Sequence, residues 1–199
     1  VSAGGVSAWH AAKRFGFEKA STDVEEIFRD KETTVVVIAT RHDSHASLVL
    51  RALKEGKHVF VEKPLCIKED ELEEIVETYS SICSAQSSPP VLMVGFNRRF
   101  SPLTVKTKEL LAKLAGPKAV IITVNAGHIP SDHWIHDQEI GGGRIAGEAC
   151  HFVDLARYLV DAKFSRWERL EMKCLNKDTA TLQFSFEDGS IGTVHYLAN

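Results

Sequence analysis

The feature that most constrains the fold is an unbroken β-branched run at residues 33–40, Thr-Thr-Val-Val-Val-Ile-Ala-Thr. A continuous run of this kind is typical of a strand that is covered on both faces, as in a parallel sheet. Two more apolar strands follow at 58–61 and 91–94, and a helical pattern separates each strand from the one before it. Because parallel strands need crossover connections, this alternation predicts right-handed βαβ units.

The helical segments carry their own boundary signals. Asp43 or Ser44 can cap the helix that ends at Gly56, where glycine supplies a left-handed stop. The other helices are predicted at 7–15, up to residue 30, and at 68–83. Residues 1–5 resemble the end of a strand that runs into a glycine turn, so we expect the chain to begin inside a domain.

After residue 100 the alternation gives way to a different pattern. It predicts a helix at 104–114, a strand at 119–124, a loop at 127–143, a helix at 147–159 and strands at 167–174, 180–186 and 191–197. Asp188-Gly189 predicts a hairpin with a type I′ turn between the last two strands. We therefore expect an α/β protein in two parts, with an incomplete parallel sheet in 1–100 and an α+β domain with an open, mostly antiparallel sheet in 101–199.

Composition excludes several functional classes. The 199 residues carry 24 basic and 27 acidic side chains, a formal charge of −3, which favours neither nucleic acid nor a membrane surface as partner. No apolar run approaches the ~20 residues of a spanning helix, and no signal-peptide pattern is present. The four cysteines include no CxxC pair, which favours a reducing cytoplasm over a disulfide framework. We therefore expect a cytoplasmic protein with a small-molecule ligand.

Polar clusters follow each of the three predicted parallel strands. In chain order they are Ala39, Thr40, Arg41, His42 and His45, then Glu62, Lys63 and Pro64, then Asn97 and Arg98. Because the carboxyl ends of parallel strands meet at one edge of a sheet, where ligands bind, we expect these side chains to lie together. A capped turn would explain the first cluster alone, but three clusters in register favour a binding site. The Lys63-Pro64 peptide bond is a candidate for the cis form.

A second candidate site lies on the helix predicted after the glycine run at 141–143. Glu148, His151 and Asp154 are spaced three apart, so they lie on neighbouring rows of one helix face. A neutral histidine can take the proton of an alcohol, and carboxylates beside it can orient its ring. The alternative is a solvated helix face that carries a satisfied histidine.

The histidines of the 127–143 loop have two interpretations. Together with His151 they could form a zinc or iron site, but their spacing matches neither a helix-borne ligand pair nor a zinc finger, so we expect no metal. The interpretation we prefer is that the loop covers a substrate, with His133, Trp134 and His136 stacking on or hydrogen bonding to a sugar.

In this order and spacing, the motifs resemble the Gfo/Idh/MocA family of NAD(P)-dependent oxidoreductases. The resemblance rests on residues 36–45, 56–64, 95–100 and 141–154 and spans nearly the whole chain. It implies a Rossmann-type domain, NAD or NADP as cofactor, hydride transfer at a hydroxyl of a sugar, inositol or nucleotide-sugar, and a homo-oligomer (dimer or tetramer). Residues 143–154 are more particularly similar to a bacterial branch fused to a zinc alcohol dehydrogenase-like half.

The resemblance also implies a role for each cluster. Lys63 would hold the substrate oxygen and His151 would take its proton, with Asp154 or Glu148 orienting the imidazole. The three sheet-edge clusters would bind the cofactor, together with Ser2 near the adenine-side ribose.

Two departures from the family pattern keep other functions open. Gly147 stands where the family has an aspartate, and Glu148 is the nearest acid that could replace it. The family's first strand and its GxGxxG turn are absent from this sequence, so we expect a chain truncated at both ends. A degenerate member that binds a sugar or a partner chain without turnover is therefore an alternative. A biliverdin- or imine-type reductase, which needs no proton-abstracting histidine, is another.

Overall fold

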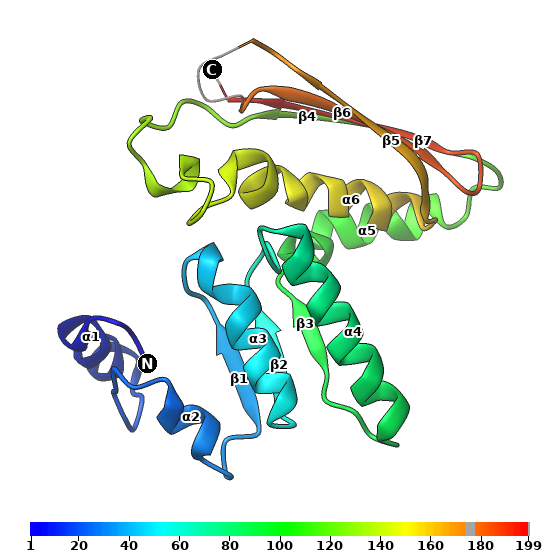
Figure 1. Ribbon diagram of the computed structural model, residues 1–199. Coiled ribbons are helices and arrows are strands. Elements are labelled where there is room, and N and C mark those ends of the chain that lie inside the picture. The colour runs from blue at the N-terminus through cyan, green and yellow to red at the C-terminus, as the bar shows by residue number, and fades with distance from the viewer. Residues whose placement is uncertain (174–177, 199) are drawn as a thin grey trace.

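A computed structural model of the chain describes residues 1–173 and 178–198, arranged around two separate sheets (Figure 1). The first sheet is parallel, in the order β1-β2-β3, which confirms the predicted βαβ alternation. Its elements are α1 (Gly5–Phe15), α2 (Glu25–Arg29), β1 (Val35–Ile38), α3 (His45–Lys54), β2 (His58–Val61), α4 (Glu69–Ala85) and β3 (Leu92–Val94).

One face of this sheet carries the first hydrophobic core. Val36 and Ile38 of β1 pack against Val49 of α3, and side chains of β2 and α4 complete the cluster. The other face is open among the described residues, because Val35 and Val37 are 53% and 68% exposed. The prediction of a strand covered on both faces is therefore wrong for the part of the chain that the structure describes, since α3 and α4 pack on the same side.

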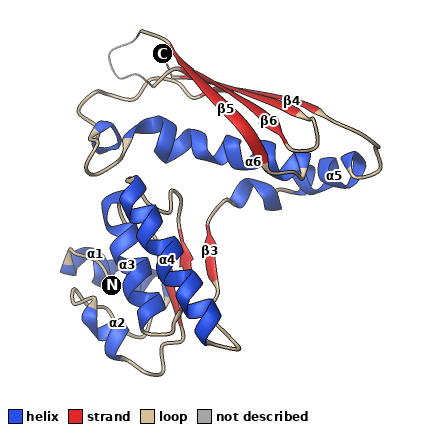
Figure 2. Ribbon diagram, turned by 45° about the vertical axis from the view of Figure 1, so that its right-hand side comes forward, coloured by secondary structure: helices blue, strands red, loops and turns tan. Residues whose placement is uncertain are grey.

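The second sheet is mixed and has the order β4-β7-β6-β5. Only the β4–β7 pair is parallel, so the prediction of an open, mostly antiparallel sheet is confirmed. Helix α6 packs against the inner face of the sheet, and α5 lies beside α6 (Figure 2). The elements are α5 (Pro102–Leu111), β4 (Ala119–Asn125), α6 (Cys150–Val160), β5 (Phe164–Glu171), β6 (Ala180–Phe186) and β7 (Ile191–Leu197).

Several local expectations need correction. The hairpin at Asp188 and Gly189 forms, but only Gly189 has a positive φ, 85°, so its turn is not type I′. The predicted helix at 147–159 starts earlier, as a π-helical turn (Ile145–Ala149) that leads into α6. The first four residues form no strand, and the Ser2 amide donates a hydrogen bond to the Ser21 carbonyl. Among the described residues, no helix is long and apolar enough to cross a membrane.

The two sheets meet where the carboxyl ends of β1 to β3 face the beginning of α6 (Figure 1). The Asp43 amide, after β1, donates a hydrogen bond of 3.1 Å to the Ile140 carbonyl. Lys68, at the start of α4, forms an ion pair of 2.5 Å with Glu139. The loop before α6 is therefore held against the edge of the parallel sheet. This contact brings the predicted sheet-edge clusters toward the helix that carries Glu148, His151 and Asp154.

Candidate active site

Lys63 extends from the end of β2 to the π-helical turn. Its Nζ donates a hydrogen bond of 2.7 Å to the Gly147 carbonyl, and the peptide bond from Lys63 to Pro64 is cis, as expected. An ammonium group has three donors, and the described residues accept a hydrogen bond from one of them. This bond brings the ammonium to the residue directly before Glu148, and the charge of Lys63 contributes to the lowered pKa values of His151 and Glu148.

His151 lies in the first turn of α6 with both ring nitrogens unbonded. Nδ1 is buried, and no described residue forms a hydrogen bond with either nitrogen. Burial, followed by the charges of Lys63 and Arg98, lowers the pKa of His151 to about 4, although Asp154 and Glu148 act in the opposite direction. The imidazole is therefore neutral near pH 7, the form that can accept a proton.

Glu148 is held by two groups from different elements. Its Oε2 accepts a hydrogen bond of 2.9 Å from Arg144 Nε and another from the Tyr196 hydroxyl. Burial raises the pKa of Glu148, but these hydrogen bonds and the charges of Arg144 and Lys63 together outweigh burial, and the pKa lies below its ordinary value. Glu148 is therefore a carboxylate at neutral pH.

Asp154 is paired with Arg99, which follows β3. Arg99 Nε lies 2.6 Å from Asp154 Oδ2, and a second guanidinium nitrogen bonds Oδ1. Both acids that were expected to orient His151 are thus occupied by arginines, and neither bonds its ring. The structure differs here from the expected imidazole–carboxylate pair.

His42 connects the first sheet-edge cluster to the loop before α6. Its Nδ1 donates to the Gly141 carbonyl at 2.8 Å, and its ring meets Trp134 edge-on with the centroids 4.9 Å apart. A Cβ at Gly147 would lie 2.8 Å from His42 Cε1 and from Ile135 Cδ1. The imidazole of His42 therefore occupies the space that a side chain at position 147 would need.

Some of the remaining sheet-edge residues are exposed at the edge, and others are buried and hold its turns together. Ala39, Thr40, Asn97 and Arg98 are exposed, and Glu62 is half-buried. His45 is fully buried, with its ring nitrogens 2.7 Å from the Pro64 carbonyl and 3.1 Å from that of Thr40, so it braces two turns instead of facing a ligand. Ser2 precedes α1, and its amide bonds the Ser21 carbonyl at 3.2 Å.

The predicted substrate loop is ordered around Trp134. Its ring stacks near His133, and the Arg41 guanidinium lies 5.6 Å from its centroid. His136 Nε2 is buried without a hydrogen-bond partner among the described residues. The described residues contain no group of three or more His, Cys, Asp or Glu side chains that could hold a metal ion.

Sequence reasoning missed Arg144, Tyr196 and Arg99. Arg144 stands four residues before Glu148, and this spacing alone would have indicated a helical ion pair. Tyr196 points inward from β7, but no local pattern connects it with a residue 48 positions earlier. The Arg99–Asp154 pair could not be predicted for the same reason, because its two residues lie 55 positions apart and meet only in the folded chain.

Comparisons with known proteins agree with this fold. The chain is 28% identical to the myo-inositol 2-dehydrogenase of Thermotoga maritima, over 92% of this chain and 55% of that protein. It is 31% identical to the levoglucosan dehydrogenase of Pseudarthrobacter phenanthrenivorans, over 77% of this chain and 40% of that protein. A structure of a levoglucosan dehydrogenase in complex with NADH and levoglucosan superposes with a TM-score of 0.85 and 28% identity, covering 100% of this chain and 56% of that one.

The parallel sheet and its helices define a Rossmann-type α/β scaffold. Residues 2–85 match the model of the Gfo/Idh/MocA family, described as an oxidoreductase family with an NAD-binding Rossmann fold. The chain spans about half the length of the relatives that it matches.

The described residues fit the nicotinamide half of a dinucleotide. The exposed edge residues follow β1 and β3, on either side of the strand that ends at Lys63. Phe96, just after β3, meets the His151 ring edge-on with the centroids 6.2 Å apart. Two donors of the Lys63 ammonium and the His151 ring have no hydrogen-bond partner in the part of the chain that the structure describes, which suits a bound pyridine ring and a hydroxyl next to it.

Proposed function

We propose that this chain belongs to an NAD-dependent dehydrogenase that oxidises a hydroxyl of a sugar or cyclic polyol. The observation that carries the proposal is the convergence of Lys63 and a neutral, unbonded His151 at the carboxyl edge of a parallel sheet. That edge is where open α/β sheets bind ligands. The relatives named above act on myo-inositol and levoglucosan, and both are hydroxyl-bearing rings.

In this proposal His151 and Lys63 have different roles in proton transfer. His151 takes the hydroxyl proton, and Lys63 donates a hydrogen bond to the same oxygen and stabilises its developing charge. NAD supplies the ring that accepts the hydride. Glu148 and Asp154 contribute fixed negative charge, since both raise the pKa of His151 and so strengthen it as a base.

The remaining assignments follow from position. Residues 1–100 would form the dinucleotide-binding part and 101–199 the substrate part. The exposed sheet-edge residues would contact the cofactor, and His133, Trp134 and His136 would contact the sugar. His42 would act through the loop, because its ring is already bonded to Gly141.

Replacement of Lys63 by Met tests the proposal. In the full-length protein, Lys63→Met should lower turnover by about 100-fold, because the developing charge loses its donor, while the Kd for NADH stays within about threefold. Steady-state rates with myo-inositol and NADH fluorescence titration measure the two effects. Lys54→Met, an exposed lysine of α3, is the matched control and should behave as the wild type. Unchanged turnover in Lys63→Met would remove the lysine from the chemistry.

A binding protein without turnover is the second candidate, favoured by the absence of a side chain at Gly147. The two functions differ in one measurement. A dehydrogenase binds NADH at micromolar concentration, whereas a protein that only binds a sugar gives a flat NADH fluorescence titration.

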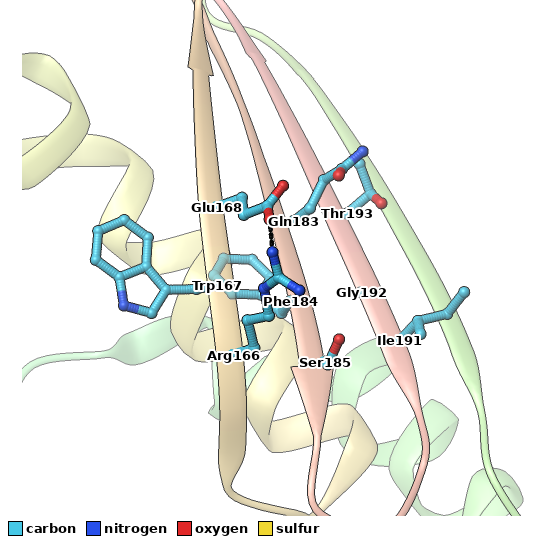
Figure 3. Close-up of a pocket in the computed structure, with 9 residues that line it drawn as sticks. All are labelled: Arg166, Trp167, Glu168, Gln183, Phe184, Ser185, Ile191, Gly192 and Thr193. Carbon is cyan, nitrogen blue, oxygen red and sulfur yellow. Dashed lines mark hydrogen bonds and ion pairs between the residues drawn. The ribbon is translucent and has the colours of Figure 1, made fainter.

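The finer assignments concern the protein as a whole. We propose a cytoplasmic homo-oligomer that associates through the outer face of the second, four-stranded sheet. Part of this face appears in Figure 3. On that face the Arg166–Glu168 ion pair of β5 lies beside Gln183 and Ser185 of β6. Ile191 of β7 is 60% exposed on the same face. Membership of the branch fused to a zinc alcohol dehydrogenase-like half is a prediction that the complete coding sequence tests.

A further inference from the structure

Tyr196 and Arg144 form a buried anchor for one carboxylate. Tyr196, on β7, is 1% exposed, and Arg144 is 2% exposed. The Arg144 guanidinium lies over the Tyr196 ring, 5.5 Å from its centroid, and also donates to the Gly127 carbonyl at 2.7 Å. A charged group as deeply buried as Arg144 is costly unless it is paired, and Arg144 is paired with two carboxylates, Glu148 at 2.9 Å and Asp178 at 3.7 Å.

The two oxygens of Glu148 are not equivalent. Oε2 receives both the Arg144 and the Tyr196 hydrogen bonds, and no described residue donates to Oε1. The Glu148 side chain is 34% exposed, although both of its anchors are buried. Oε2 is therefore fixed by two buried side chains, and Oε1 remains available as an acceptor.

The free oxygen belongs to the candidate site. Lys63 lies near enough for its charge to lower the pKa of Glu148, and Glu148 in turn raises that of His151. The Lys63 ammonium bonds the carbonyl of Gly147, the residue directly before Glu148. A hydroxyl-bearing ring between Lys63 and His151 would thus have a carboxylate oxygen within reach of a second hydroxyl.

We propose that Glu148 Oε1 accepts a hydrogen bond from a second hydroxyl of the polyol substrate, and that Tyr196 is the positioning residue that holds Glu148 in place for it. This inference rests on the proposed function and adds a requirement to it: the substrate must carry a hydroxyl next to the one that reacts. A carboxylate is a strong, acceptor-only partner for a hydroxyl, and a fixed one binds without losing side-chain entropy.

The test removes only the Tyr196 hydroxyl. In the full-length protein, Tyr196→Phe should raise the KM for myo-inositol about tenfold and leave kcat within about threefold, because hydroxyl binding weakens while Lys63 and His151 stay in place. The Glu148 carboxyl pKa, followed by ¹³C NMR in the cofactor-free protein, should move upward, since a stabilising hydrogen bond to the carboxylate is lost. Tyr79→Phe in α4, against the first core, is the matched control and should change neither value.

Glu148→Gln provides a second variant if the Tyr196 change disturbs folding. It keeps the side-chain shape but loses the charge, and its KM should rise by at least as much as that of Tyr196→Phe. An unchanged Glu148 pKa in Tyr196→Phe, or an unchanged KM in both variants, overturns the inference. If the wild-type protein does not oxidise myo-inositol, the proposed function fails on that substrate, and the carboxyl pKa alone then decides whether Tyr196 positions Glu148.

Discussion

Gly147 determines which groups can meet in the site. Because it has no Cβ, the His42 ring and Ile135 come within 2.8 Å of the position that a Cβ would take. Its carbonyl still faces Lys63, so this residue contributes through its backbone alone. An acid at this position would displace His42, and the neighbouring Glu148 is the acid that the packing permits.

The burial of His151 predicts a pH dependence of stability. Its pKa falls to about 4 in the folded chain, against about 6.5 for an unfolded one, so the unfolded chain binds more protons between these values. This contribution is fully present above pH 6.5 and is lost as the pH falls toward 4. Urea unfolding from pH 7.5 to 4 should therefore show a smaller loss of stability for His151→Gln than for the wild type.

His10→Gln, which removes an exposed imidazole from α1, is the control for that series. The free energy of unfolding of His10→Gln should change with pH as that of the wild type does. Parallel curves for His151→Gln and the wild type would contradict the neutral, buried state of His151.

At the scale of elements, the Arg99–Asp154 pair fastens α6 to the 3₁₀ turn (Asn97–Phe100) after β3. Asp154 is buried and receives two hydrogen bonds from Arg99, whose side chain is 33% exposed. Asp154→Asn removes the charge and leaves the arginine unpaired. The free energy of unfolding should fall by about 2 kcal/mol, measured by urea denaturation.

Glu109→Gln offers a matched comparison, because Glu109 forms an exposed ion pair with Lys106 within α5. Such pairs contribute little, so its effect should stay within about 0.5 kcal/mol. Equal losses in the two variants would mean that the Arg99–Asp154 pair does not fasten α6.

The elements themselves were predictable, because each depends on neighbours in the chain. The β-branched run at 33–40 predicts β1. Gly189 supplies the positive φ of the turn between β6 and β7. The contacts that build the site were not predictable, since they join distant residues: His42 and Gly141 lie 99 positions apart. Local pattern therefore indicated the clusters, but not that Asp154 and Glu148 bond arginines instead of His151.

At the scale of the whole molecule, the outer face of the second sheet predicts self-association. Ile121, Leu170 and Ile191 are 74%, 61% and 60% exposed, and the strand registers place them on one face. Ile121→Glu puts a charge in this face and should shift the full-length protein toward the monomer, as measured by light scattering after gel filtration. Leu103→Glu, on an exposed position of α5, should leave the mass unchanged. A monomeric wild type would contradict the prediction.

The Lys63–Gly147 hydrogen bond is a direct tie between the two halves of the chain. If a hinge let the parallel sheet and α6 separate, the ammonium would leave its carbonyl and the proton acceptor would lose its electrostatic neighbour in the same movement. The bond would then be present only when the two halves are docked. Catalytic readiness would be a property of how the halves are docked, and neither half possesses it alone.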